Sequence, residues 1–289
     1  MTPRTPRLAV LGLGTMGRAM AASALRHGIP TVVWNRSPDA AREVVEQGAE
    51  LAPSVTDAVE EVDVVITMVT DAAAVEEIAV ELGMLEAVRP ESVWAQMSTI
   101  GVEGTTRIAA MATRTRPDVH FLDAPVSGSK VPAEQGTLVI FASGSELARS
   151  TVEPVFDAVG RRTVWLGPVG LGSRMKVVNN TLLAFSAEGV ANSLALAHRL
   201  GLDAHSVRDA FEGGPLLSTW MAGKLSRIEQ GEYSPEFPLT LALKDVRLAL
   251  DAGAGRFGVL AALAGEWQGI VEQGLGDEDV TVVTRSLQD

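Results

Sequence analysis

Cysteine is absent from this chain of 289 residues. Its absence excludes disulfides, iron–sulfur clusters, thiol redox chemistry and cysteine nucleophiles. Histidine is scarce, and the four histidines lie far apart without an H-x-x-x-H pair, at His27, His120, His198 and His205. We therefore expect no metal site. Any redox chemistry that the chain performs has to come from a bound organic cofactor.

Basic residues are in the minority, because 24 lysines and arginines face 36 aspartates and glutamates, a formal net charge of −12. A surface this negative repels phosphate backbones, so we expect no nucleic-acid partner. The apolar run that follows the basic start breaks at Gly12. This run is too short for a signal peptide or a membrane span. We expect a soluble, cytoplasmic protein with no membrane partner.

The order of apolar patterns predicts two domains, in line with about 150 residues per domain. Residues 1–166 alternate short β-branched runs with amphipathic stretches, which predicts an α/β domain of Rossmann type, with a mainly parallel sheet. Residues 167–289 have apolar residues at helical spacing and predict an all-α domain. The expected strands cover 8–11, 31–34, 63–69, 92–96, 120–123, 137–143 and 163–165, and the expected helices 16–27, 38–47, 175–200, 204–212, 221–230, 240–252 and 259–273.

A glycine-rich turn separates the first expected strand from the first expected helix. Gly12, Gly14 and Gly17 fit the pattern G-x-G-x-x-G, and Thr15 and Met16 complete the turn. The first glycine allows a tight turn, the second lets the backbone approach a pyrophosphate, and the third permits close packing of helix and strand. Such turns also have purely structural uses, but this position in the first βα unit favours dinucleotide binding.

The end of the second expected strand indicates which nucleotide binds. NAD sites usually carry Asp or Glu there, whereas this chain has Asn35, Arg36 and Ser37. Arg36 can pair with a 2′-phosphate, and its two neighbours offer hydrogen bonds. Ser37 can equally serve as a helix N-cap before Pro38, and the two roles are compatible. We predict NADPH as the preferred cofactor, with NADH as the alternative.

A lysine stands near the start of the helical half. On a helix, Asn180 lies one turn after Lys176 on the same face, and Asn179 lies beside it. Apolar neighbours indicate that Lys176 is at least partly buried. A lysine that faces a cleft can protonate an alkoxide as hydride reaches the carbonyl carbon, and the reverse reaction needs it neutral. The alternative is a surface lysine whose stem lies along apolar side chains.

Four segments of the chain together resemble the β-hydroxyacid dehydrogenases. They are the glycine turn, the lysine helix, residues Asp123-Ala124-Pro125-Val126-Ser127-Gly128-Ser129, and residues Phe237-Pro238-Leu239-Thr240-Leu241-Ala242-Leu243-Lys244-Asp245. That family includes 3-hydroxyisobutyrate dehydrogenase, tartronate semialdehyde reductase, and the glyoxylate and succinic semialdehyde reductases. The resemblance runs from about Leu8 to Leu275. It implies an NADP-binding Rossmann domain followed by a helical domain like the C-terminal domain of 6-phosphogluconate dehydrogenase.

The resemblance also implies roles for individual residues. Lys176 matches the catalytic lysine, and Asn180 matches the asparagine that positions lysine and substrate. Ser127 and Gly128 fall in the turn that binds the substrate carboxylate, and Ser-Gly-Ser after a strand suits an anion physically. Gln96 stands where the family usually has Asp, two residues before Ser98. The remaining assignments are Ser129, Thr99, Phe237 and Asp245 for the substrate, and Met68, Val69, Thr99 and Lys244 for the cofactor.

The implied activity is NADPH-dependent reduction of a small carboxylated aldehyde or 2-oxo acid, of the glyoxylate or succinic semialdehyde type, or the reverse oxidation of a 3-hydroxy acid such as 3-hydroxyisobutyrate. The nucleotide would lie at the carboxyl ends of the strands, in an interdomain cleft. Residues 129–134 and 237–239 resemble the glyoxylate and succinic semialdehyde reductases, whereas residues 218–220 resemble the hydroxyisobutyrate branch, so the substrate stays open.

Two other functions remain as alternatives: an imine reductase on the same scaffold, and a non-catalytic NADP-binding protein. Lys176 argues against the first, because imine reductases commonly have Asp or Tyr at that position. The intact set of Lys176, Asn180, Ser127 and Lys244 disfavours the second. The resemblance further implies a homodimer or homotetramer formed through the helical domain. Residues 182–200 could supply that contact or belong to the core of the domain.

Overall fold

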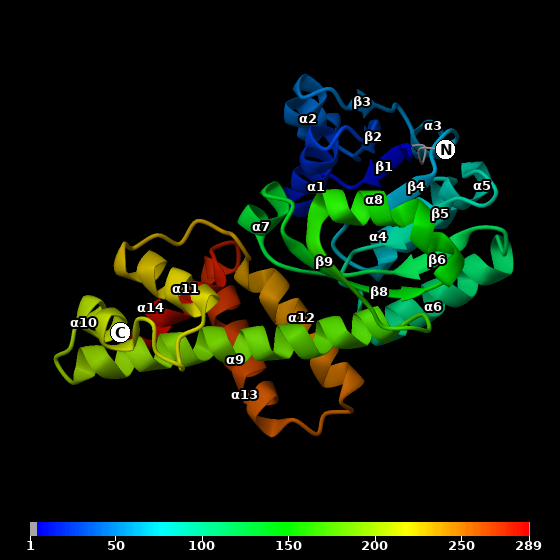
Figure 1. Ribbon diagram of the computed structural model, residues 1–289. Coiled ribbons are helices and arrows are strands. Elements are labelled where there is room, and N and C mark those ends of the chain that lie inside the picture. The colour runs from blue at the N-terminus through cyan, green and yellow to red at the C-terminus, as the bar shows by residue number, and fades with distance from the viewer. Residues whose placement is uncertain (1–4, 289) are drawn as a thin grey trace. The chain divides into compact units, whose positions relative to one another are not determined.

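The computed structural model describes residues 5–288 of the chain. Figure 1 shows the elements in chain order. The chain divides into two compact units, Met1–Lys176 and Val177–Asp289. The division falls inside one long helix, α9 (Leu171–Arg199), close to Lys176.

Nine strands within the described residues form one sheet, in the order β3-β2-β1-β4-β5-β6-β8-β7, with β9 beside β8. Neighbours from β3 to β6 are parallel, β8 is antiparallel to both β6 and β7, and β9 is parallel to β8. The bounds are β1 (Leu8–Leu11), β2 (Thr31–Trp34), β3 (Glu50–Leu51), β4 (Val64–Thr67), β5 (Val93–Gln96), β6 (His120–Asp123), β7 (Val126–Ser127), β8 (Leu138–Gly144) and β9 (Gly160–Trp165). The mainly parallel sheet confirms the predicted α/β class.

Both faces of this sheet are buried. Because successive strand residues point to opposite sides, each strand contributes side chains to both faces. In β1, Leu8 and Val10 belong to one apolar cluster, and Ala9 and Leu11 to another. Figure 1 shows α1 and α8 on one side of the strands and α6 on the other. The first cluster also takes side chains from α1 (Thr15–Arg26), α2 (Arg42–Glu46), α7 (Lys130–Glu134) and α8 (Arg149–Val159), and the second from α3 (Val55–Val59), α4 (Ala72–Glu76), α5 (Met84–Ala87) and α6 (Gly101–Thr115).

The second unit consists of helices among the described residues, as predicted. Its main core lies around Trp267, which is fully buried and donates a hydrogen bond from Nε1 to Glu188 Oε2 at 2.8 Å. After α9 come α10 (Ala204–Phe211), α11 (Thr219–Glu229), α12 (Leu239–Ala252), α13 (Gly258–Ile270) and α14 (Val283–Gln288). None of the helices in residues 5–288 is long and apolar enough to cross a membrane.

Four of the expected helices differ from the structure by only one or two residues at an end, whereas the other three differ more. The helix expected at 38–47 is divided into a 3-10 helix over Pro38–Ala41 and the short α2. The helix expected from residue 175 begins earlier, at Leu171, because Gly172 is a packing residue and not a helix breaker. The helix expected at 259–273 ends at Ile270 and continues as a wider π turn, in which Gly274 has a φ of 85°.

Candidate active site

The glycine turn between β1 and α1 has the geometry that a dinucleotide requires. Gly12 has a φ of 100°, and a Cβ there would lie 2.4 Å from the carbonyl oxygen of Met68. A Cβ on Gly17 would lie 1.9 Å from the carbonyl oxygen of Gly12. Gly14 has no heavy atom within 4 Å of its Cβ position, which leaves room for a phosphate. The turn also brings Met68 and Val69 of the neighbouring strand end beside it, as the cofactor assignment requires.

The start of α1 suits an anion. Gly14 occupies the N-cap position, and no side chain caps the helix there. Its first turn holds no acidic residue, although the chain as a whole is acidic. The first amides of a helix and its dipole favour negative charge, so this helix end fits a pyrophosphate. Thr15 and Met16 are the first two residues of this helix.

The end of β2 reaches back to the glycine turn. The backbone N–H of Leu13 donates to Asn35 Oδ1 at 2.8 Å, and Asn35 Nδ2 donates to the carbonyl of Ser37 at 3.0 Å. Asn35 therefore fixes the shape of the turn. The Arg36 side chain is 74% exposed and forms an ion pair with Glu77. Ser37 stands at the N-cap of the 3-10 helix, but its hydroxyl makes no capping hydrogen bond.

Gln96 replaces the usual aspartate without losing the hydrogen bonds of its loop. Its Oε1 accepts from the N–H of Ser98 at 2.7 Å, and its Nε2 donates to the carbonyl of Ser98 at 3.0 Å. An ionised aspartate has no donor for that carbonyl. Ser98 Oγ in turn accepts from the N–H of Val69 at 2.9 Å. The loop that leads to Thr99 is thus tied to the strand end that carries Met68 and Val69.

The proposed carboxylate turn follows β7. Gly128 has a φ of 133°, a backbone conformation that favours glycine, and a Cβ there would also lie 2.6 Å from Leu138 Cδ2. Ser127 ends the strand, and Ser129 precedes α7 without capping it through its side chain. Asp123, which opens the same segment, is fully buried and is not among the expected site residues.

A buried polar group links α9 to α12. Asn180 and Asp245 are 4% and 6% exposed, and Asn180 Nδ2 donates to Asp245 Oδ2. Asn179 Nδ2 donates to Asn180 Oδ1 at 2.9 Å, so both ends of the Asn180 amide are held. Lys244 Nζ lies 3.2 Å from Asp245 Oδ1. The structure thus brings together three expected residues, Asn180, Lys244 and Asp245. Lys176, which is half-buried, lies one turn before Asn180 on α9.

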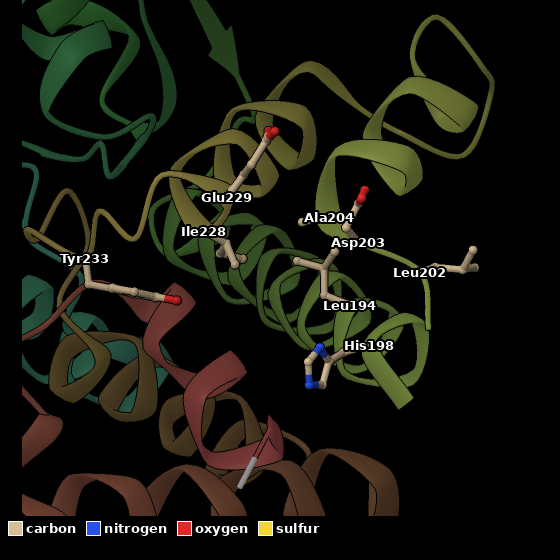
Figure 2. A pocket seen from close by; sticks show the side chains of 8 residues that line it. All are labelled: Leu194, His198, Leu202, Asp203, Ala204, Ile228, Glu229 and Tyr233. Carbon is tan, nitrogen blue, oxygen red and sulfur yellow. The ribbon is translucent and has the colours of Figure 1, made fainter. Parts of the chain in front are cut away.

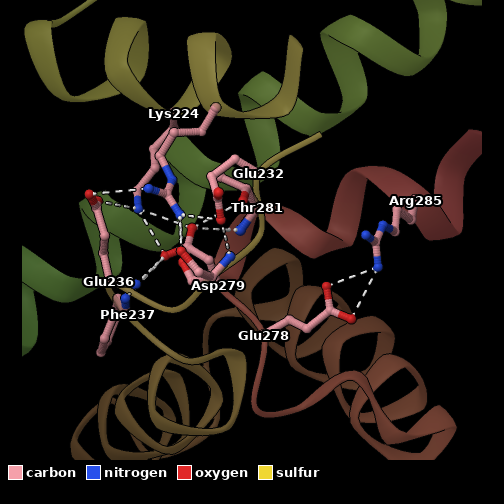
Figure 3. Close-up of polar contacts among 10 residues, drawn as sticks. Lys224, Glu232, Glu236, Phe237, Glu278, Asp279, Thr281 and Arg285 are labelled. Atoms are coloured by element: carbon pink, nitrogen blue, oxygen red, sulfur yellow. Dashed lines mark hydrogen bonds and ion pairs between the residues drawn. The ribbon is translucent and has the colours of Figure 1, made fainter. Parts of the chain in front are cut away.

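The loop that carries Phe237 is held by a carboxylate that the sequence motifs do not include. Figure 3 shows polar contacts converging on Asp279. Asp279 Oδ2 accepts from the backbone N–H groups of Glu236 and Phe237, both at 3.0 Å. Lys224 Nζ lies 3.0 and 2.9 Å from its two oxygens. Burial opposes ionisation of Asp279, but Lys224 and the backbone donors outweigh it and lower its pKa.

Comparison with known proteins identifies the family. The model for the NAD binding domain of 6-phosphogluconate dehydrogenase matches residues 7–167, and the model described as NAD-binding of NADP-dependent 3-hydroxyisobutyrate dehydrogenase matches residues 170–287. Glyoxylate/succinic semialdehyde reductase 1 of Arabidopsis thaliana is 33% identical over 282 residues, which cover 96% of this chain and 97% of that protein. The chain belongs to the 3-hydroxyisobutyrate dehydrogenase-like β-hydroxyacid dehydrogenases. It is accordingly an NAD(P)-binding oxidoreductase of that family.

Solved structures of related proteins have the same fold. The 3-hydroxyisobutyrate dehydrogenase of Mycobacterium tuberculosis, solved with L-serine, has a TM-score of 0.86 and 28% identity, with 99% of this chain and 100% of that chain covered. Psf3, in complex with NADP+ and 2-OPP, has a TM-score of 0.89 at 23% identity, with 97% and 99% covered, and shows the fold alone.

A separate cavity lies within the helical unit. It has a volume of about 230 Å³, and Figure 2 shows side chains from α9, α11 and nearby loops around it. None of the expected site residues of this β-hydroxyacid dehydrogenase lines it; its lining includes Leu194, His198, Asp203, Ile228, Glu229 and Tyr233. No group of three or more His, Asp or Glu residues that could hold a metal ion occurs in the described part of the chain.

Proposed function

We propose that this β-hydroxyacid dehydrogenase is an NADPH-dependent, cytoplasmic reductase of small carboxylated aldehydes or 2-oxo acids, of the glyoxylate or succinic semialdehyde type. The same site would catalyse the reverse oxidation of a 3-hydroxy acid such as 3-hydroxyisobutyrate. The observation that carries the proposal is the buried Asn180–Asp245–Lys244 group one turn after Lys176. The 33% identity to a glyoxylate/succinic semialdehyde reductase supports the substrate class.

In this proposal, individual residues of the chain bind the substrate, transfer the proton and orient the reacting groups. Ser127, Gly128 and Ser129 bind the substrate carboxylate through hydroxyl and backbone N–H groups. Lys176 Nζ gives a proton to the substrate oxygen during reduction and accepts it during oxidation. Asn180 orients substrate and lysine, since its own amide is fixed by Asp245 and Asn179. When bound, NADPH supplies the hydride for the carbonyl carbon.

A substrate panel combined with one variant tests the catalytic assignment. The panel contains glyoxylate, succinic semialdehyde, methylmalonate semialdehyde, tartronate semialdehyde and a cyclic imine, each with NADPH. We expect Lys176→Ala to lower kcat about 10²–10⁴-fold while the Kd of NADPH stays the same. Arg174→Ala, on the exposed side of the same helix, is the matched control and should keep its activity. Full turnover by Lys176→Ala would contradict the mechanism, and turnover of the imine alone would favour an imine reductase.

The preference for NADPH depends on Arg36. To pair with a 2′-phosphate, its exposed guanidinium has to exchange Glu77 for the phosphate, and a phosphate binds arginine through charge-assisted hydrogen bonds. Loss of such a bond is worth about 1.5–3 kcal/mol, so Arg36→Ala should raise the KM of NADPH about ten- to a hundredfold. The KM of NADH should change little. Preference of the unmodified enzyme for NADH would contradict the assignment.

The proposed partners are a small carboxylated substrate and a second copy of the chain, whereas nucleic acid and membranes are not proposed. The helical unit exposes an apolar row on α9, because Val178 and Leu182 are 64% and 70% exposed. We propose that this row contributes to a homodimer or homotetramer. Leu182→Glu should then reduce the mass measured by light scattering to that of a monomer, whereas a monomeric unmodified protein would contradict the proposal.

A further inference from the structure

A buried carboxylate–hydroxyl cluster lies where α9 begins. Asp123, at the end of β6, is fully buried, as is Ser143 of β8, and Ser173 of α9 is 3% exposed. Ser173 Oγ donates to Asp123 Oδ1 at 2.6 Å, and Ser143 Oγ donates to Asp123 Oδ2 at 3.2 Å. Thr105 of α6 contacts Ser173 Oγ at 2.7 Å. Since the Ser173 hydroxyl hydrogen is used by Asp123, Thr105 is the donor in this last bond.

The cluster also satisfies backbone amides in the first turn of α9. These amides have no partner within a helix and need one from elsewhere. The N–H of Gly172 donates to Ser143 Oγ at 2.9 Å, and the N–H of Ser173 donates to Asp123 Oδ2 at 2.8 Å. Partners for the start of α9 thus come from two strands of the sheet. A negative carboxylate at this end is additionally favoured by the helix dipole.

Close packing fixes the same turn sterically. A Cβ on Gly172 would lie 2.3 Å from the carbonyl oxygen of Phe141 and 2.6 Å from that of Asp123. The helix backbone therefore lies directly against β6 and β8, and a larger residue would push it away. The hydrogen bonds and the close packing of Gly172 together fix the position of α9 along its axis and its rotation about that axis at this turn.

The expected site residue that follows this turn most closely along α9 is Lys176. It follows Ser173 by three residues, which places the two on neighbouring positions of one side of α9. We propose that Asp123, Ser143 and Ser173, named here the α9 clamp, are positioning residues that set the place of Lys176. This inference rests on the proposed function in that Lys176 is taken as the proton donor. The clamp residues themselves act through the helix and do not contact the substrate.

The clamp uses the ionised carboxylate of Asp123 as a hydrogen-bond acceptor, whereas the buried surroundings disfavour its charge. Burial raises the pKa of Asp123, and the hydrogen bonds from Ser173 and Ser143 offset this only in part. The carboxylate accepts from three donors at once: Ser173 N, Ser173 Oγ and Ser143 Oγ. An asparagine would turn an NH₂ group toward at least one of them. Asp123→Asn keeps the shape and breaks the clamp.

The test compares clamp variants with a matched serine. Ser92 is buried and its Oγ donates to the carbonyl of Val62 at 3.1 Å, so Ser92→Ala removes one buried hydroxyl away from α9. Ser173→Ala should lower the melting temperature more than Ser92→Ala, because it removes a bond to a buried carboxylate as well as the bond from Thr105. We expect Ser173→Ala to lower kcat about tenfold and Asp123→Asn up to about 10²-fold, with the Kd of NADPH unchanged. Ser92→Ala should keep kcat.

Amide hydrogen exchange provides a readout that does not depend on activity. We expect the amides of residues 172–180 to exchange about two- to tenfold faster in Ser173→Ala than in Ser92→Ala, because a hydrogen bond that holds the turn is lost. Equal exchange and equal kcat in these two variants would overturn the clamp, even if Asp123→Asn does not fold. If Lys176→Ala keeps full activity, or no substrate is turned over, the proposed function fails, and exchange alone then decides whether the clamp exists.

Discussion

The Lys224–Asp279 pair gives the sharpest prediction about stability. The Lys224 side chain is 3% exposed and the Asp279 side chain 0%. Lys224 Nζ also lies 2.9 Å from Glu236 Oε2. Lys224→Met keeps most of the aliphatic stem but leaves Asp279 charged, buried and without its cation. Removal of one partner from a buried ion pair is worth about 3–5 kcal/mol of unfolding free energy. Because domains are stable by about 5–15 kcal/mol, this loss is easily measured.

The double variant separates charge from packing. Asp279→Asn alone leaves Lys224 without its closest carboxylate, although Glu236 still faces it. In Lys224→Met combined with Asp279→Asn, no buried charge remains at this pair. We therefore expect the double variant to lose about 1–3 kcal/mol less than the sum of the single losses, the coupling typical of residues in contact. The asparagine introduced by Asp279→Asn still has one side-chain oxygen for the N–H of Phe237.

Equilibrium unfolding in urea at pH 7 measures these free energies by linear extrapolation. Circular dichroism and tryptophan fluorescence are recorded together, because the chain has two compact units and coincident transitions are required for a two-state analysis. Lys130→Met is the matched control, since Lys130 lies 3.9 Å from Glu134 with side chains 51% and 50% exposed. It should change the free energy by about 0–1 kcal/mol. The reasoning is refuted if Lys224→Met loses no more than this control, or if the two single losses simply add.

Three further predictions concern the other unit. Gly17→Ala should abolish NADPH binding and destabilise the fold, because its Cβ would overlap the carbonyl oxygen of Gly12, as calorimetric titration and thermal melts would show. Gln96→Asp should lower the melting temperature by several degrees, since the carbonyl of Ser98 loses its donor at a buried site. The pKa of Asp123 is raised in the folded state. At pH values between its ordinary and its raised pKa, the folded state therefore binds a proton that the unfolded state does not. Its contribution to the unfolding free energy should therefore increase as pH falls from 7 through that window, and urea titrations of Asp123→Asn should lack this increase.

Short-range features of the fold and site can be predicted from the sequence. The glycine turn is recognisable because each glycine is required for a local steric reason. At Gly12 and Gly17 the structure shows this directly, since a Cβ there would clash with backbone atoms. The Lys176–Asn180 spacing follows from helical periodicity alone. The two-residue strands β3 and β7 are not among the predicted strands, since a run of two residues has no periodicity to detect.

Long-range polar contacts cannot be predicted in the same way. Asp123 and Ser173 are 50 residues apart, and Lys224 and Asp279 are 55 apart. No spacing rule connects such pairs, because the fold and not the local chain brings them together. One signal is present for Asp123: it ends an apolar strand and opens the segment that leads to Ser127. A buried acidic residue at the end of a strand has to find donors, and the first turn of a helix supplies them.

The two buried carboxylates perform the same task for different segments. Asp123 accepts an N–H three residues before Lys176, and Asp279 accepts the N–H of Phe237. Their surroundings differ. Burial raises the pKa of Asp123, and its hydroxyl and amide donors offset this only in part, whereas Lys224 and backbone donors lower the pKa of Asp279 despite burial. As pH falls, Asp123 should consequently be protonated before Asp279, and the clamp loses an acceptor while Asp279 still holds the Phe237 loop. The loss of activity in acid should then follow the start of α9 more closely than the Phe237 loop.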